Sequence, residues 1–292
     1  MDKLGVVILN YLNFNDTIEC VDSLLSQTKQ PDVIVIVDNY SNNESVKNIK
    51  KKYIGIDYIT IIEVKKNVGY ARGNNVGIDY CIKSGINDVL VINNDTLFND
   101  STVIEKIYAL KIGEDIGAIG PCIIGSDNLM QNPVYKDNSM YSMLRRYIYT
   151  LVSESVIYSK MKNNKVVETN SISKKSKTFS YYLHGSAILL TKNYLDRIPG
   201  FYPKTFLYVE ENILDFIMKK LHLKMLYVDN IVINHKEDQS SALAFNNDSK
   251  IYLKHMKKSS KIAIFVKLKT IRKIQRIVKK YNMKEDYNVI IE

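Results

Sequence analysis

The sequence has little cysteine, and the cysteines are poorly placed for a disulfide or a metal site. Cys20, Cys81 and Cys122 are an odd number, lie far apart and sit within apolar patterns. No CxxC pair and no Cys/His group is present. This spacing argues against a disulfide framework and a zinc site, and it predicts buried free thiols in a reducing compartment.

A long apolar run is also missing. No stretch approaches the roughly 20 apolar residues that a membrane-spanning helix needs. The first apolar run, residues 4–10, is too short and too lightly charged at its start for a secretory signal. We therefore expect a cytoplasmic protein that could act at a membrane only peripherally, from its inner face.

Acidic residues are scarce at one end of the chain. Residues 246–292 carry 13 Lys and Arg against 4 Asp and Glu, whereas residues 1–245 carry 28 against 27. With 292 residues, 46% of them hydrophobic, the chain is long enough to bury a full core. We expect a neutral α/β domain over 1–245 and a basic helical appendage over 246–292.

What the sequence does contain is a series of short, apolar, β-branched runs that end in polar residues. They lie at residues 4–10, 33–38, 57–63 and 88–93. Helical patterns separate them, the first with Asn15 or Asp16 as its N-cap. This order predicts a mostly parallel sheet with helices on both sides, whose ligands bind at the carboxyl ends of the strands.

The run at 88–98, DVLVINNDTLF, is the most informative of these. Its apolar part stops abruptly at Asn93, Asn94 and Asp95. Asp95 is a hard oxygen donor that could hold Mg or Mn against a diphosphate. The alternative is an ordinary strand followed by an Asn/Asp turn.

Seven segments in a fixed order resemble one known family. They are VVILNYLNFNDTIECVDSLLSQ, VIVIVDNYSNNESV, NVGYARGNNVGI, VLVINNDTLF, IGAIGPCI, YLHGSAILLT and GFYPKTFLYVEENILDFIMKK. Together they resemble the family 2 inverting glycosyltransferases of the GT-A fold, over about residues 4–240. The resemblance is greatest to bacterial rhamnosyl- and galactosyltransferases that build capsule, O-antigen and other surface polysaccharides.

The resemblance implies a set of donor-binding residues. Nucleotide contacts are implied for Asp38 at the end of the second strand, with Asn10 and Tyr11 beside it, and for Asn67, Arg72 and Asn75 in a glycine-containing loop. Asn93, Asn94 and Asp95 occupy the DXD position, where the last acid holds a divalent metal, Mn or Mg, against the donor phosphates. Asn93 replaces the first acid of that motif, and the segment His184–Ser186 would lie beside the donor sugar and the acceptor.

The resemblance also implies the catalytic base. Relatives carry two acids where this chain has Glu210 and Glu211, and the second acid takes the proton of the acceptor hydroxyl; Glu210 would support it. The alternative is that this pair only complements a helix dipole, since a later acid of the pattern is Ile213 here. His235 matches a histidine that is sometimes a further metal ligand, with a structural role as its alternative.

Two stretches lie outside these motifs. Residues 126–180 are polar and carry Tyr141, Tyr147, Tyr149 and Tyr158, so they could form either an acceptor-side insertion or a surface helix. Residues 250–284 predict a basic helix whose apolar face could lie on an anionic membrane or pack on its own domain. Nucleic-acid binding is not expected, because no recognised module accompanies the charge. The apolar face of this basic helix comprises Ile264, Leu268, Ile271, Ile274 and Val278.

The expected function is transfer of a sugar from a UDP or dTDP donor to a growing, lipid-linked surface glycan. Asn93 and Ile213 depart from the acidic pattern, so a non-catalytic subunit that binds nucleotide sugar or glycan is an alternative. A nucleotidyltransferase would need a Gly-rich, basic phosphate loop after the first strand, which NYLNFND lacks.

Overall fold

The computed structural model of the chain describes residues 2–135, 137–153, 181–236, 249–282 and 287–291. The expected insertion therefore lies partly outside the described residues, Tyr158 included. In chain order the elements are β1 (Leu4–Asn10), α1 (Phe14–Leu25), β2 (Val33–Asp38), α2 (Ser45–Tyr53), β3 (Ile59–Val64), α3 (Tyr70–Lys83), β4 (Asp88–Asn93), β5 (Thr96–Leu97), α4 (Val103–Tyr108), β6 (Ile116–Gly125), α5 (Met140–Ser153), β7 (Ala187–Leu190), α7 (Lys192–Leu195), α8 (Glu210–Lys220), β8 (Lys224–His235), α10 (Ser249–Leu268), α11 (Ile271–Asn282) and β9 (Tyr287–Ile291).

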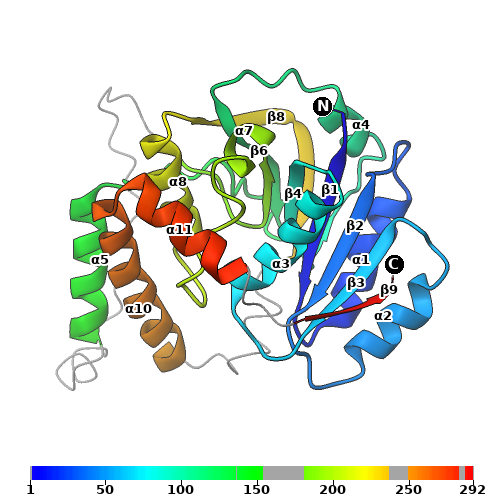
Figure 1. Cartoon of the computed structure of the whole chain (residues 1–292), viewed down its shortest axis with the longest axis horizontal. Coiled ribbons are helices and arrows are strands. Elements are labelled where there is room, and N and C mark those ends of the chain that lie inside the picture. Colours follow the sequence, from blue (N-terminus) through cyan, green and yellow to red (C-terminus); the bar gives the residue numbers. More distant parts are fainter. Residues whose placement is uncertain (1, 136, 154–180, 237–248, 283–286, 292) are drawn as a thin grey trace.

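The described strands form one mixed sheet with the order β5-β8-β6-β7-β4-β1-β2-β3-β9 (Figure 1). The strands β4, β1, β2 and β3 are parallel, as is the pair β6 and β8. The pairings β4 with β7, β6 with β7, β5 with β8 and β3 with β9 are antiparallel. The parallel half places the polar ends of β1, β2 and β4 at one edge, as expected for the α/β class.

Alternating side chains of the parallel strands enter two separate cores. On β1, Leu4, Val6 and Ile8 pack with residues of α1, α2 and α4. Val7 faces the other side, where α3, α7, α8, α10 and α11 contribute the core. Because both faces are covered, the strands are apolar throughout rather than alternating, which is why their runs are visible in the sequence.

The C-terminal segment packs on this domain. Ala263 and Val266 of α10, and Ile274 and Val278 of α11, are fully buried. The strand β9 pairs with β3 at the sheet edge. Part of the apolar side of this segment thus faces its own domain, whereas Leu268 of the expected apolar face and Phe265 are exposed together with the basic side chains. No helix among the described residues is long and apolar enough to cross a membrane.

Local details of two elements differ from the sequence prediction. The N-cap of α1 is Asn13, whose side chain accepts a hydrogen bond from the Asp16 amide; neither Asn15 nor Asp16 caps the helix. Asn13 is preferred because Leu12 adopts a left-handed conformation that ends the strand exit and turns the chain into the helix. The third strand begins at Ile59 and ends at Val64, later than the expected 57–63.

Candidate active site

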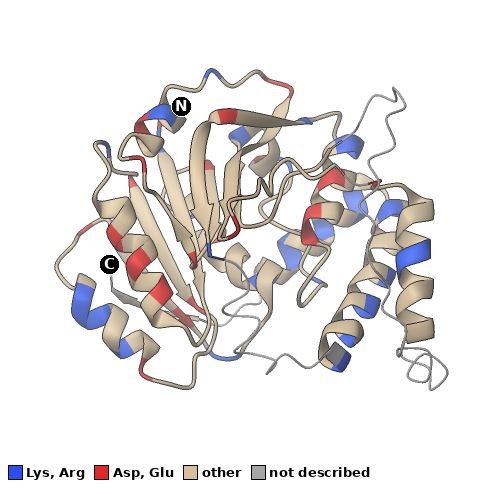
Figure 2. Ribbon diagram, turned by 180° about the vertical axis from the view of Figure 1, so that it is seen from behind, with Lys and Arg blue, Asp and Glu red and all other residues tan. Residues whose placement is uncertain are grey.

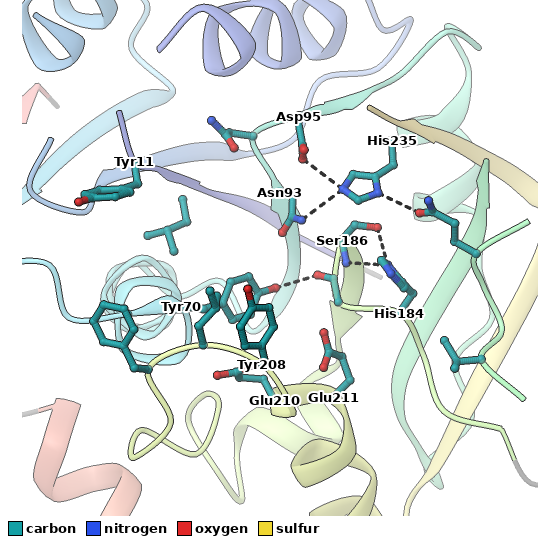
Figure 3. Close-up of a pocket in the computed structure, with 18 of the residues that line it drawn as sticks. Tyr11, Tyr70, Asn93, Asp95, His184, Ser186, Tyr208, Glu210, Glu211 and His235 are labelled. Atoms are coloured by element: carbon teal, nitrogen blue, oxygen red, sulfur yellow. Dashed lines mark hydrogen bonds and ion pairs between the residues drawn. The ribbon is translucent and has the colours of Figure 1, made fainter. Parts of the chain in front are cut away.

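A cavity of about 750 Å³ opens at the carboxyl edge of the sheet (Figure 3). Its walls come from the ends of β1, β2, β4 and β8, from the loop at 67–70, and from the start of α8. Among its lining residues are eleven that the sequence singled out: Tyr11, Asn67, Asn93, Asn94, Asp95, the segment His184–Ser186, Glu210, Glu211 and His235. Residues more than 200 positions apart in the chain are thereby brought to one space.

Sheet pairing brings His235 to the end of β4. The short strand β5 pairs with the end of β8, so that Thr96 is opposite His235. His235 and Asp95 are both buried, and their Nε2 and Oδ1 atoms lie 3.2 Å apart. Asn94 turns away to donate to the Asn13 carbonyl and the Thr17 hydroxyl, which ties the start of α1 to this turn.

The hydrogen bonds of His235 define which ring nitrogen carries the proton. Its Nδ1 lies 2.8 Å from Gln131 Oε1, an atom that can only accept, so Nδ1 donates. Its Nε2 lies 3.4 Å from Asn93 Nδ2, which can only donate. Nε2 therefore presents a lone pair, and the facing Asp95 Oδ1 presents another. Two acceptor atoms this close are stabilised by a positive charge, which is either a second proton on His235 or a metal ion bound to both.

The donor set fits a divalent metal held jointly by protein and substrate. Asp95 Oδ1 is buried and receives no hydrogen bond from any described residue. Carboxylate oxygen with imidazole nitrogen suits Mn, while oxygen ligands alone suit Mg. No group of three or more His, Cys, Asp or Glu ligands occurs in the described part of the chain. The protein would thus supply two ligands, Asp95 and His235, and leave the remaining positions to other oxygen atoms.

The two acids occupy the first turn of α8 on the other side of the cavity. Tyr208 and Val209, directly before them, have φ angles of 71° and 73°. This left-handed conformation is costly for side chains with a Cβ, and costliest for β-branched Val209. It turns the chain sharply so that Glu210 and Glu211 enter the cavity at the helix start. A Cβ at Gly185 would lie 2.2 Å from Glu211 Oε1, so glycine at 185 makes room for this carboxylate.

The surroundings of Glu210 and Glu211 shift the pKa values of the two carboxyls unequally. Burial raises the pKa of Glu210 well above its ordinary range, and the neighbouring Glu211 charge raises it further. Burial also raises the pKa of Glu211, but a backbone hydrogen bond and the Arg146 charge oppose the rise. Of the two carboxyls, Glu210 therefore has the stronger tendency to hold a proton, and Glu211 the stronger tendency to be ionised. A carboxylate is the form that can accept a proton.

Asp38 and Asn10 lie behind the cavity wall. Both are fully buried, with Asn10 Nδ2 donating to Asp38 Oδ1 at 2.6 Å and the Ser41 amide donating to Asp38 Oδ2 at 2.8 Å. The next residue, Asn39, lines the cavity and donates to Asn67 Oδ1 at 3.1 Å. The polar exit of β2 thus reaches the cavity through Asn39, with Asp38 and Asn10 holding the turn behind it.

Arg72 and Asn75 do not line the cavity. The Arg72 guanidinium lies over the Tyr281 ring, at 5.4 Å from its centre. Asn75 is buried and clamps the backbone of Phe201, accepting from its amide at 2.7 Å and donating to its carbonyl at 2.9 Å. Gly69 lines the cavity and lies close to the Phe206 carbonyl, since a Cβ at 69 would lie 2.3 Å from that oxygen.

Sequence reasoning missed several lining residues. Asn39 directly follows Asp38 at the polar end of the second strand, and this position could have predicted that it lines the site. Tyr70, whose hydroxyl donates to the Gly185 carbonyl at 2.7 Å, opens α3 within the quoted glycine loop. Gln131 carries no local signal, because it lies in a polar stretch and reaches His235 only through the fold.

Comparison with known sequences places these residues in a family. The model of glycosyl transferase family 2 matches residues 5–178, more than half of the chain. A low-salt glycan biosynthesis hexosyltransferase, Agl10 of Haloferax volcanii, is 24% identical over 258 residues, which are 87% of this chain and 73% of the relative. The dTDP-rhamnosyl transferase RfbF of Shigella flexneri is 23% identical over 124 residues, which are 42% of this chain and 40% of the relative.

Solved structures share the fold at low sequence identity. The mannosyltransferase PcManGT of Pyrobaculum calidifontis, in complex with GDP-Man and Mn²⁺, superposes with a TM-score of 0.52 at 11% identity, over 96% of this chain and 73% of that one. TarS 1–349 of S. aureus with UDP-GlcNAc gives 0.57 at 11% identity, over 96% and 71%. The sheet, the helices on both faces and the matched family model agree, and the chain belongs to glycosyl transferase family 2, with the GT-A fold.

Proposed function

We propose that this glycosyltransferase moves a sugar from a nucleoside diphosphate donor to a hydroxyl of a growing glycan, with inversion at the anomeric carbon. The observation that carries the proposal is the composition of the cavity. On one side the buried Asp95 Oδ1 and His235 Nε2 atoms lie 3.2 Å apart, and on the α8 side the two adjacent acids Glu210 and Glu211 have raised pKa values, with that of Glu211 held down by the Arg146 charge. These two sides suit a leaving diphosphate and an attacking hydroxyl, respectively.

The roles of the residues follow from a single displacement. The acceptor oxygen forms a bond to the anomeric carbon as the bond from that carbon to the diphosphate oxygen breaks, and the bonding pair leaves with the diphosphate. Glu211 takes the proton of the acceptor hydroxyl. Glu210 keeps its proton and supports Glu211. A divalent metal, when bound by Asp95 and His235, would stabilise the charge of the departing diphosphate.

We assign the nucleotide to the side of the cavity lined by Tyr11, Asn39 and Asn67. Tyr11 offers an aromatic face, and the two amides offer donors and acceptors at the ends of β1 and β2. Asp38 and Asn10 position this turn, while Arg72 and Asn75 hold the 67–75 segment from behind. The donor would be UDP- or dTDP-linked, in keeping with the dTDP-rhamnosyl transferase among the relatives.

The acceptor would be a lipid-linked glycan of the capsule or O-antigen type, elongated at the cytoplasmic face of the membrane. The relatives named above are a glycan biosynthesis hexosyltransferase and a rhamnosyl transferase, which supports a glycan acceptor. Arg146 of α5 and Asn212 of α8 are joined by a hydrogen bond of 3.1 Å next to Glu211. Neither residue lines the cavity, so this pair would act by holding α5 against the start of α8, behind Glu211.

The test compares Glu211→Gln with Glu210→Gln, which are close to isosteric changes in adjacent residues. General-base catalysis contributes about 10²- to 10⁴-fold, so Glu211→Gln should lower turnover by that order and leave donor affinity nearly unchanged. Glu210→Gln should reduce turnover less, because the residue already carries a proton. The measurement is steady-state transfer to a defined acceptor, paired with calorimetric titration of UDP and dTDP.

The opposite order of effects would assign the base to Glu210. If both variants lower turnover only slightly, Glu210 and Glu211 serve only to complement the helix dipole, and another residue is the catalytic base. A wild-type chain that binds a nucleotide sugar, yet neither transfers nor hydrolyses it with Mn, would instead support the non-catalytic binding subunit, for which Asn93 at the DXD position is the supporting feature.

A further inference from the structure

The helix α5 is oriented with its apolar side outward. Tyr141, Leu144, Ile148 and Leu151 recur at helical spacing along one face, and their exposed fractions are 72%, 45%, 49% and 41%. Surface helices of globular proteins place such a stripe toward the core. An exposed apolar stripe on a terminal layer marks an interaction surface.

The opposite face of α5 is the one that contacts the protein. Met143 and Thr150 are buried there, and Arg146 donates to Asn212 of α8. The helix lies beside α10 at the outer end of the molecule, away from α2 (Figure 1). The inward contacts of α5 are thus made by Met143, which joins the hydrophobic core, and by Arg146 and Thr150, and the four exposed apolar side chains lie away from these contacts.

The surroundings of this stripe carry charge of one sign. Residues 140–153 and 249–282, which form α5, α10 and α11, contain 14 Lys and Arg and no Asp or Glu. Lys254, Lys258 and Lys261 of α10 are exposed. In Figure 2 the ribbons of α5 and α10 carry blue stretches and no red ones. A positive field around an apolar stripe matches a negatively charged surface with an apolar layer beneath it.

We propose that the exposed face of α5, flanked by the α10 lysines, is a membrane-binding surface for anionic lipid. Tyr141, Leu144, Ile148 and Leu151 would enter the boundary between headgroups and acyl chains, and the lysines would contact acidic headgroups. A second copy of this chain is the less suitable partner, because it would bring a second surface of the same positive charge. The basic side chains of the C-terminal segment would assist this binding, while its buried apolar side chains, such as Val266 and Ile274, stay in the domain core.

The helix α10, which packs against α5, holds one wall of the cavity, so lipid binding would orient the active site. Ser259 of α10 donates to the Leu207 carbonyl at 2.8 Å, and His255 stacks on Phe206 with ring centres 5.0 Å apart. Phe206 and Leu207 line the cavity. This consequence rests on the proposed function: it sets the acceptor side of the cavity beside the leaflet that would carry a lipid-linked acceptor. The lipid surface itself does not depend on it.

The experiment is flotation of the full-length chain with vesicles of phosphatidylcholine, with and without phosphatidylglycerol. The wild type should float with the anionic vesicles and much less with the neutral ones. The double variant Leu144→Glu/Ile148→Glu should lower the partition coefficient roughly tenfold or more, since it puts charge into the apolar stripe. Lys254→Gln/Lys258→Gln should lower it about 5-fold for each charge removed at low salt.

Matched controls lie on α2 and at Ile54 directly after it, at the other end of the molecule (Figure 1). Ile54→Glu changes an apolar residue that is 66% exposed, and Lys50→Gln/Lys51→Gln removes two exposed charges. Both should float as the wild type does. The α5 variants should also keep the wild-type thermal midpoint and the wild-type transfer rate to a soluble acceptor. If the wild type itself shows no transfer, the proposed function fails, while flotation still tests the lipid surface.

Two results would overturn the proposal. One is equal flotation of the wild type and the Leu144→Glu/Ile148→Glu variant. The other is a wild-type dimer in light scattering that this variant dissociates, with no vesicle binding by either protein; α5 would then be an interface between two copies. Flotation that is lost in the α5 variant but retained in the α2 variants supports the lipid surface.

Discussion

His235 illustrates how a single side chain depends on its neighbours. A neutral histidine can carry its proton on either nitrogen, and only one choice leaves a lone pair toward Asp95. The side-chain oxygen Oε1 of Gln131 favours the tautomer with the proton on Nδ1, because it accepts a hydrogen bond from Nδ1 at 2.8 Å. Metal-binding histidines usually have such a partner, which also fixes the plane of the ring. Gln131 is thus a positioning residue for the proposed metal site.

We predict that Gln131→Leu weakens Mn binding by about 10- to 100-fold, because the imidazole loses both its orientation and its preferred tautomer. Gln131→Glu should restore most of the affinity, since a carboxylate also accepts from Nδ1. The measurement is calorimetric titration of Mn in the presence of UDP, with Asp95→Ala as the variant that should lose the Mn-dependent part of nucleotide affinity. Unchanged affinity in Gln131→Leu would remove its positioning role, and unchanged affinity in Asp95→Ala would remove the metal assignment.

The residues that sequence alone could predict are those whose place is set by an adjoining regular element. Asp95 follows a buried strand, and Glu210 and Glu211 begin an amphipathic helix, so their direction was inferable. Gln131 and Asn39 gain their place from loops that return to the sheet, and no periodicity describes such loops. Asn10 and Asp38 were correctly expected at the sheet edge, but a strand end does not specify which of two successive side chains points into the cavity.

At the scale of elements, the same four apolar runs predicted β1 to β4 because both sides of these strands are buried. The short strands β5 and β7 gave no comparable signal, since two and four residues are too few for a pattern. For α10 and α11 the sequence left two options open, a membrane-bound helix or one packed on its domain. The buried side chains of both helices lead us to propose that they are integral to the fold.

We predict that Ile274→Ala in α11 lowers the free energy of unfolding by about 2 to 5 kcal/mol, the usual cost of emptying a buried isoleucine site. The side chain is fully buried against the domain. Lys279→Ala on the exposed side of the same helix should change this free energy by less than about 0.5 kcal/mol. Urea denaturation followed by circular dichroism gives both values.

A chain ending at residue 248 provides a second readout of the same proposal. It lacks the buried side chains of α10 and α11 and the strand β9, so it should lose its cooperative unfolding transition. A truncated chain with the wild-type midpoint, or a mild Ile274→Ala, would instead make residues 246–292 a separable appendage.

At the scale of the whole molecule, the residues of the active site lower the free energy of unfolding. Glu210 is 4% exposed, and its carboxyl oxygen Oε1 has no hydrogen-bond partner among the described residues. Beside it, Tyr208 and Val209 adopt left-handed conformations. These features bring two acids together, which a fold selected for stability alone would avoid. The large two-sided core must offset this cost.

The destabilisation caused by Glu210 depends on pH. Burial and the Glu211 charge raise the pKa of Glu210 in the folded protein, while the unfolded chain titrates near the ordinary value of 4.5. Between these two values the folded state holds a proton that the unfolded state has released. The free energy of unfolding therefore falls as pH rises above about 4.5, and it continues to fall until the folded pKa is reached.

We predict that Glu210→Gln is more stable than the wild type by about 1 to 3 kcal/mol at pH 8, and that this gain disappears toward pH 4.5. Glutamine fills the same volume without a group that must bind a proton to fold. Urea denaturation at several pH values measures the difference. Glu114→Gln, an exposed change of the same chemistry, should leave the pH dependence of the wild type unaltered. If Glu210→Gln also follows the wild-type curve, Glu210 titrates normally in the folded protein, and the assignment of the shared proton to it is wrong.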